Sequence, residues 1–295
     1  MSKPVYHAVS FSGGKDSTAM VLHMIDLGYK IDEVFFCDTG MEFPGMLRHI
    51  EKIKAIVEAN GLKFVTLRPE HSFEWYLAEK VVSKRKEGSD LFGLPGYGWP
   101  TPRGRWCTRH LKLDVINKHL KELQKDHTVV QYLGIAADEQ HRLSRKNNQD
   151  KQHQHPLVEW GWTEKDAMDY CRRFGFDWGG LYDMFGRVSC WCCPLQRLDH
   201  LRKLRRHLPE LWQELIRLDK GQAKTFKPGT TVEMLDKRFA LEDALVAAGH
   251  SIKSPAFFDV LKRHLAGETS IEDIPKELVG DNHKQLTFSE EGGCL

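Results

Sequence analysis

The chain has 295 residues, a hydrophobic content of 41% and a formal net charge of +2 at pH 7. This length suits one large domain or one domain with an appendage, and the composition suits a globular protein with a sizeable core. The charge is too small to indicate a nucleic-acid partner by itself, and no apolar run reaches the roughly 18 residues of a membrane span. The start, MSKPVYHAVSFSGG, lacks the features of a secretory signal, so a cytoplasmic protein without membrane association is predicted.

Short segments rich in β-forming residues alternate with helical patterns along the first half of the chain. Strands are expected at residues 5–11, 33–39, 63–69 and 128–136, with helices at 17–27, 46–60 and 108–125. A further helix at 163–174 begins with the capping-box-like TEKD, in which Asp replaces the usual Glu. The alternation predicts an α/β fold with a doubly wound, mostly parallel, Rossmann-like sheet.

Two stretches interrupt this alternation. Residues 84–105 are rich in glycine, proline and basic residues, which predicts a long functional loop, and residues 141–155 are strongly polar. From about residue 197 onward the pattern is helical only. We therefore expect an α/β domain over residues 1–185, followed by a cysteine cluster and a helical C-terminal region with a tail over residues 186–295.

The sequence SFSGGKDS at residues 10–17 joins the first strand to the first helix. Gly13 and Gly14 allow positive φ and a close approach of backbone N–H groups to a ligand, and a helix N-terminus attracts anions. Lys15 adds a positive charge, and Ser12 and Ser17 add hydroxyl donors. The spacing fits neither a Walker A loop nor a dinucleotide-binding fingerprint.

SGGKDS resembles the PP-loop of the adenine nucleotide α-hydrolase superfamily. Four further stretches resemble the phosphoadenosine phosphosulfate (PAPS) reductase-like branch of that superfamily: DTGMEFP at 38–44, WCTRHLK at 106–112, LGIAADEQHR at 133–142 and HPLVEW at 155–160. The resemblance implies an adenine nucleotide α-hydrolase-like fold, a sheet-completing role for HPLVEW, and sulfur chemistry on an adenine nucleotide. The implied nucleotide-binding residues are Ser12, Gly13, Gly14, Lys15, Asp16, Ser17, Asp38, Thr39, Gly134, Glu139 and Arg142, with Lys15 and Asp38 also taking part in catalysis. Ala136 stands where the family usually has an arginine, which removes one anion contact.

Seven cysteines, three of them at positions 190, 192 and 193, favour metal binding or redox catalysis over a disulfide framework. The C-x-x-C pair Cys190 and Cys193, with Cys107 elsewhere in the chain, favours a [4Fe–4S] cluster, for which Cys192 is a candidate fourth ligand. Structural zinc and free buried thiols are the alternatives. A nearby helix N-terminus and arginines are expected to lower the pKa of Cys107.

Two features near the C-terminus have open interpretations. Cys294, in the tail EEGGCL, is either a catalytic nucleophile like the tail cysteine of PAPS reductases or an incidental thiol. The helix at 197–215 carries Arg202, Lys203, Arg205 and Arg206, and is either a nucleic-acid surface or a solvated basic face. Cys37 and Cys171 are expected in the core, as are Trp160 and Trp162.

These patterns leave three hypotheses about function. The first is a PAPS reductase-family enzyme that reduces a sulfated adenylate and uses a thiol electron donor. The second is an ATP-dependent sulfurtransferase that thiolates tRNA, DNA or a small molecule, with sulfur from a donor protein and Mg²⁺ as a companion of the nucleotide. The third is a catalytically silent nucleotide-binding protein. The oligomeric state is left open.

Overall fold

The computed structural model describes residues 3–82, 87–88, 92–144 and 152–271. The chain forms two compact units, Met1–Thr225 and Phe226–Leu295. The boundary expected near residue 185, between the α/β domain and the C-terminal region, stays a prediction. None of the described helices is long and apolar enough to cross a membrane.

The first unit is built on a five-stranded sheet, β3-β2-β1-β4-β5, in which every pairing is parallel. Its strands are β1 (Val5–Phe11), β2 (Glu33–Cys37), β3 (Lys63–Leu67), β4 (Thr128–Leu133) and β5 (His153–Gln154). The predicted α/β class and the first four strands are confirmed. The expectation that HPLVEW completes the sheet is wrong, because β5 precedes this segment and Pro156–Glu159 form helix α6.

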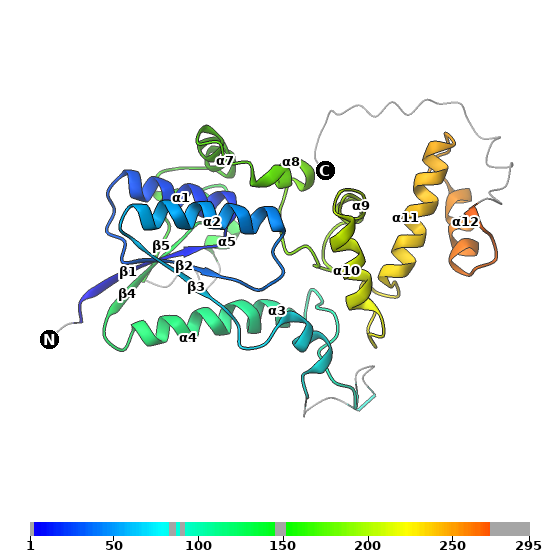
Figure 1. Cartoon of the computed structure of the whole chain (residues 1–295), viewed down its shortest axis with the longest axis horizontal. Helices are drawn as coiled ribbons and strands as arrows, with labels where there is room; N and C mark the ends of the chain where they lie inside the picture. The colour runs from blue at the N-terminus through cyan, green and yellow to red at the C-terminus, as the bar shows by residue number, and fades with distance from the viewer. Residues whose placement is uncertain (1–2, 83–86, 89–91, 145–151, 272–295) are drawn as a thin grey trace. The chain divides into compact units, whose positions relative to one another are not determined.

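Helices cover both faces of this sheet (Figure 1). On one face lie α1 (Lys15–Asp26) and α2 (Pro44–Ala59), and on the other lies α4 (Asp114–Leu123). Because side chains alternate along a strand, Ala8 and Phe35 face α4 and pack with its Ile116 and Leu120. Phe11, three residues after Ala8 in β1, points to the opposite face, where it contacts the rings of Phe36 and Phe64.

Local sequence signals account for the helix ends. Pro44 is the first residue of α2, where its missing N–H costs nothing, and Gly61 follows the helix with φ of 73°. Helix α7 (Glu164–Arg173) begins with a complete capping box: Thr163 accepts from the N–H of Asp166, and the Asp166 carboxylate accepts from the N–H of Thr163. The predicted use of aspartate in this box is therefore confirmed.

Short helical segments fill the long connections. The β3–β4 connection contains η1 (Trp75–Glu79), α3 (Trp106–Thr108) and η2 (Arg109–Leu113), which runs directly into α4. After β4 comes α5 (Gln140–Leu143), and after α7 come η4 (Trp178–Gly180), α8 (Leu181–Phe185), α9 (Leu198–His207) and α10 (Pro209–Asp219). The second unit pairs α11 (Val232–Ala247) with α12 (Pro255–Leu265) around Leu241, Leu245 and Phe257. The described part of the chain after residue 197 is helical, as predicted.

Candidate active site

The SGGKDS loop lies at the carboxyl end of β1, and its glycine geometry is required by packing. Gly13 has φ of 79°, and a Cβ atom there would lie 2.8 Å from Sδ of Met46 and 2.9 Å from Cγ1 of Ile50. The hydroxyls of Ser12 and Ser17 are 3.0 Å apart, and Ser17 also donates to the carbonyl of Gly14 at 3.1 Å. The loop therefore enters α1 with two hydroxyls beside the helix N-terminus, which is where an anion binds.

A turn between α7 and α8 holds this loop from outside the predicted motif. Trp178 has φ of 53°, unusual for a bulky residue, and its indole N–H donates to the carbonyl of Gly13 at 2.7 Å. Tyr182 accepts a hydrogen bond from the backbone N–H of Lys15 at 3.0 Å. Neither contact could be predicted from the sequence, in which only the two glycines at 179 and 180 indicate a turn.

Lys15 is engaged within the protein. Its Nζ lies 2.7 Å from a carboxylate oxygen of Glu164 and 3.0 Å from both carboxylate oxygens of Asp16. Burial works to lower the pKa of Lys15, but these two carboxylates outweigh burial and raise it. Lys15 is therefore held as a cation beside the loop, and its role in binding phosphate stays a prediction. Glu164, which the sequence reading missed, comes from the N-terminus of α7.

The other predicted nucleotide residues gather at the same edge of the sheet. Asp38 accepts from Nε of Arg68 at 3.1 Å, and Thr39 donates to Glu42 at 2.8 Å. Gly134 follows β4, and a Cβ atom there would lie 2.9 Å from Cα of Ser17. The structure therefore brings the ends of β1, β2 and β4 together, as expected where parallel strands end.

Two predicted nucleotide-binding residues in the segment after Gly134 contact each other. Arg142 donates to Glu139 at 2.6 Å, so these two predicted binding residues form an ion pair. Ala136, at the position where the family has an arginine, is fully buried.

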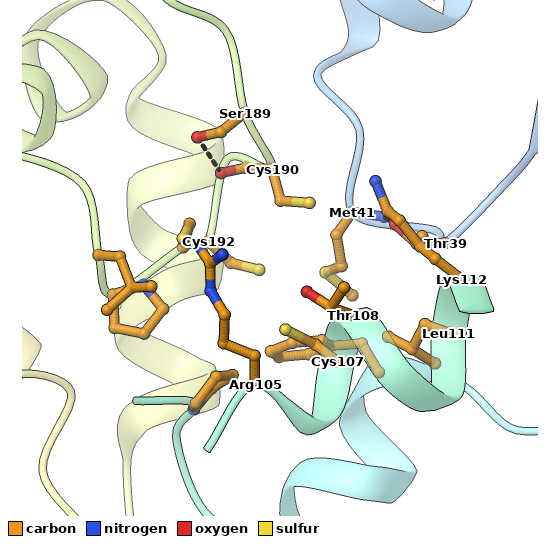
Figure 2. Close-up of a pocket in the computed structure, with 15 residues that line it drawn as sticks. Thr39, Met41, Arg105, Cys107, Thr108, Leu111, Lys112, Ser189, Cys190 and Cys192 are labelled. Atoms are coloured by element: carbon orange, nitrogen blue, oxygen red, sulfur yellow. Dashed lines mark hydrogen bonds between the residues drawn. The ribbon is translucent and has the colours of Figure 1, made fainter. Parts of the chain in front are cut away.

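A cavity of about 220 Å³ lies in the same unit, and four cysteines from two distant segments line it. Figure 2 shows Cys107 from α3 facing Cys190 and Cys192 across this space, and Cys193 also lines it. Thr39 and Met41, from the DTGMEFP segment, form another part of the wall. The N–H of Trp191 donates to the carbonyl of Met41 at 3.1 Å, which fastens the cysteine segment to the end of β2.

The cysteine segment is a tight turn. The N–H of Cys193 donates to the carbonyl of Cys190 at 3.2 Å, and the side-chain amide of Gln196 donates to the carbonyls of Cys190 and Trp191 at 3.0 and 2.8 Å. Gln196 is almost fully buried, so its side-chain amide stabilises the turn from inside the protein. No sequence pattern predicted this role of Gln196.

Burial controls the protonation of the cavity thiols. It raises the pKa of Cys107, although the N–H of Thr108 and the charge of Arg105 act in the opposite direction, so the predicted lowering is wrong. Burial also raises the pKa of Cys190 to about 11 and the pKa of Cys192 well above its ordinary value. Burial works to lower the pKa of Lys112, but the charges of Cys190 and Glu42 raise it, so a lysine cation faces the thiols.

The chemistry of this donor set fits a metal centre. Four thiols share one cavity, and a bound metal deprotonates such thiols despite their burial. Within the described residues, no three His, Cys, Asp or Glu side chains converge on one ion position. Which metal this donor set would hold, zinc or an iron–sulfur cluster, stays a prediction.

The remaining cysteine and aromatic predictions have separate outcomes. Cys37 and Cys171 are buried, and their thiols donate to the carbonyls of Leu111 and Lys15, so both are core residues as predicted. Trp160 and Trp162 pack around His23 of α1 but are only partly buried, so the prediction that they lie in the core is wrong. Cys294 lies outside the described residues.

A family model described as the phosphoadenosine phosphosulfate reductase domain matches residues 6–196. Two uncharacterized proteins of Methanocaldococcus jannaschii are 31% identical over 221 residues and 26% identical over 215 residues. These matches cover 72% and 70% of this chain but only 41% and 46% of those proteins, so the chain spans less than half of the relatives it matches.

Two solved structures are partly similar. A PAPS reductase from Candida auris, in a phosphate complex, is 17% identical with a TM-score of 0.38, covering 63% of this chain and 79% of that chain. The U34-tRNA thiolase NcsA from Methanococcus maripaludis, with its [4Fe-4S] cluster, is 13% identical with a TM-score of 0.37, covering 81% and 74%. Both TM-scores are low. The family-model match covers more than half of the chain, so the chain belongs to the phosphoadenosine phosphosulfate reductase domain family, as its motifs predicted.

Proposed function

We propose that this chain is an ATP-dependent sulfurtransferase that activates an acceptor oxygen at the SGGKDS loop and replaces it with sulfur beside the cysteine cavity. The observation that carries the proposal is the shared wall of the two sites. Thr39 and Met41 follow β2, one of the strands that end beside the loop, and they line the same cavity as the four cysteines. A nucleotide and a sulfur centre can therefore serve one reaction.

The proposed reaction has two balanced steps. An acceptor oxygen attacks the α-phosphorus of ATP, forming a P–O bond as the bond to pyrophosphate breaks. Sulfide then attacks the activated acceptor atom, forming a bond to sulfur as the bond to oxygen breaks, and AMP leaves with that oxygen. Sulfide and the departing oxygen have the same oxidation level, so no electron donor is needed.

This chain's residues have separate tasks in these steps. The hydroxyls of Ser12 and Ser17 and the N–H groups at the start of α1 would hold the phosphates, and Asp38 and Thr39 would lie beside the nucleotide. Cys107, Cys190 and Cys193, with Cys192 as the fourth candidate, would hold a [4Fe–4S] cluster, which supplies an iron site able to bind sulfur when one iron lacks a protein ligand. Lys112 would balance the negative charge of the thiolates.

Reduction of a sulfated adenylate is the second candidate, and the match to a PAPS reductase domain favours it. One observation counts against it, because Ala136 is buried and carries no charge for a second anionic group. The thiol that this reaction would use is Cys294, so the raised pKa values of the cavity thiols do not bear on it.

An anaerobic assay separates these candidates. Full-length protein with ATP, sulfide and candidate acceptors should release pyrophosphate and AMP, and Ser17→Ala should abolish that release. Thiol-dependent sulfite release from PAPS, with no pyrophosphate from ATP, would instead establish the reductase. If adenylates bind and neither product forms with any acceptor, the protein is a silent nucleotide-binding protein and the proposal is wrong.

A further inference from the structure

The stretch of chain around Cys107 is basic, aromatic and free of acidic residues. Between Asp90 and Asp114 the sequence contains no aspartate or glutamate. The same stretch contains the cations Arg103, Arg105, Arg109 and Lys112 and the aromatic residues Phe92, Tyr97, Trp99 and Trp106. A chain with a net charge of only +2 therefore concentrates positive charge beside one wall of the cysteine cavity. Interleaved cations and aromatic rings are what single nucleic-acid strands bind.

Three rings from three separate segments lie parallel to one another, and we call Tyr76, Tyr97 and His110 the aromatic platform. The ring centroids of Tyr76 and His110 are 5.1 Å apart with 2° between their planes, and those of Tyr97 and His110 are 5.6 Å apart with 8° between their planes. The backbone N–H of Tyr97 donates to the carbonyl of Tyr76 at 2.8 Å, which fixes the two segments. All three side chains are only partly buried.

Ring contacts connect the platform to the cysteine cavity. The ring centroid of Trp106 lies 5.9 Å from that of Tyr76, 5.8 Å from that of Tyr97 and 5.1 Å from that of Phe73. Phe73 lines the cysteine cavity. Trp106 therefore contacts both the platform and the cavity wall, and Cys107 is the next residue in the chain.

Three arginines of this stretch have no carboxylate partner among the residues that the structure describes. Arg103, Arg105 and Arg109 are exposed, and none of them forms an ion pair with another described residue. Arg105 lines the cavity close to Cys107 and Cys192 (Figure 2). Two of the nearby carboxylates have other partners, because Asp114 bonds His110 at 2.8 Å and Glu74 bonds Arg217 at 2.8 and 2.9 Å. A third, Glu70, acts on the Tyr76 side of the platform.

We propose that the aromatic platform and Arg103, Arg105 and Arg109 bind a single-stranded segment of nucleic acid and lead one nucleotide to the cysteine cavity. Bases would stack on the rings, and phosphates would pair with the arginines. An unpaired strand is required because a base within a duplex has no free face to stack. The inference rests on the proposed function, and it makes the acceptor a nucleic acid rather than a small molecule.

Two fluorescent oligonucleotides test this surface in the absence of ATP and sulfide. Each has 20 nucleotides of mixed sequence, and one is DNA and the other RNA. In Arg103→Gln/Arg109→Gln, affinity at 150 mM salt should fall about tenfold and the salt slope by about 1.4, because two phosphate contacts are lost. Tyr97→Leu should weaken binding about fivefold or more without changing the slope, whereas Tyr97→Phe should keep it. The oligonucleotide that binds with the higher affinity indicates whether the acceptor contains ribose or deoxyribose.

Matched variants make the test specific. Lys30→Gln/Arg173→Gln removes the same charge at exposed positions elsewhere in the first unit and should leave binding within twofold of the unaltered protein. ATP affinity should be unchanged in every variant, which also shows that the variants fold. The proposal is wrong if neither oligonucleotide binds, if the control pair loses as much affinity as the arginine pair, or if Arg205→Gln/Arg206→Gln on α9 accounts for the whole effect. It is also wrong if a polyglutamate peptide competes as well as the oligonucleotides.

The outcomes separate this inference from the proposed function. Pyrophosphate release without oligonucleotide binding would keep the sulfurtransferase and remove the nucleic-acid surface. Oligonucleotide binding that depends on Tyr97 and the arginines, without pyrophosphate release from ATP, would keep the surface and remove the sulfurtransferase.

Discussion

The hydroxyl of Tyr182 accepts a hydrogen bond from the backbone N–H of Lys15 at a distance of 3.0 Å. This N–H belongs to the first turn of α1, where no helical carbonyl is available to it, and phosphate oxygens bind such groups. On the proposed function, this side-chain oxygen, from a segment 167 residues away, occupies a position that a phosphate oxygen would use, so a bound nucleotide would displace it.

Tyr182→Phe should weaken folding and strengthen nucleotide binding at the same time. The loss of one hydrogen bond should lower the free energy of unfolding by about 1 kcal/mol. Because ATP then has no hydroxyl to displace, ATP should bind up to about fivefold more tightly. Adenosine affinity should not change. Calorimetric titration and urea unfolding measure both effects.

Tyr170→Phe is the matched control for Tyr182→Phe, because the Tyr170 hydroxyl bonds Asp26 away from the loop. It should lower stability and leave ATP affinity unchanged. Weaker ATP binding in Tyr182→Phe would show that the hydroxyl contacts the phosphates instead of yielding to them.

Gly134→Ala should disturb the loop through its backbone. The new Cβ atom would lie 2.9 Å from Cα and 3.0 Å from the amide nitrogen of Ser17, both in the first turn of α1. Overpacking of this kind costs about 1–3 kcal/mol, and the displaced Ser17 should weaken ATP binding. At Gly104 the near atom is only the side-chain hydroxyl of Thr101, so Gly104→Ala should bind ATP normally. Equal effects of the two variants would refute the close approach.

Stability should depend on pH through His49. Burial, with a contribution from Lys52, lowers the pKa of this histidine from 6.5 to about 4. The unfolded chain then binds more protons than the folded chain between these values, so stability is complete above pH 6.5 and falls by about 3 kcal/mol as pH decreases to about 4. Urea unfolding across this range should show the loss, and His49→Gln should reduce its slope. An unchanged slope in that variant would contradict the assignment to His49.

Lys112→Met should weaken binding of the proposed iron–sulfur cluster. Removal of the cation that faces Cys190 leaves the thiolate charge unbalanced, and supporting residues of this kind are worth about tenfold or more in metal affinity. Iron retention against a chelator measures the effect. Lys112→Arg should restore most of the retention, and Lys118→Met, at an exposed position of α4, should have none of the effect. If Lys112→Met loses no more iron than Lys118→Met, Lys112 does not stabilise the thiolate charge and the prediction is wrong.

Local sequence patterns predicted most of the fold, because a buried parallel strand or a capped helix end depends on a few neighbouring residues. The strands starting at Val5 and Lys63 and the Thr163 cap follow from neighbouring residues alone. The two-residue strand His153–Gln154 could not be predicted, because its polar residues resemble a loop until β4 is beside them.

The site divides in the same way. The loop at Ser12–Ser17 and the cysteine spacing are visible in sequence, but their partners come from distant segments. Trp178, Tyr182 and Glu164 contact the loop only after the chain has folded. The pKa of Cys107 was predicted in the wrong direction, because the local cations are readable in sequence whereas burial depends on the whole structure.

Sulfide-dependent AMP release by cysteine variants most directly tests whether the nucleotide loop and the cysteine cavity serve one reaction. Cys107→Ser and Cys190→Ser should bind ATP with unaltered affinity and lose sulfide-dependent AMP release, while Cys171→Ser, at a buried cysteine outside the cavity, should retain it. Undiminished AMP release by both cavity variants would mean that the cysteines take no part in the chemistry of the bound nucleotide.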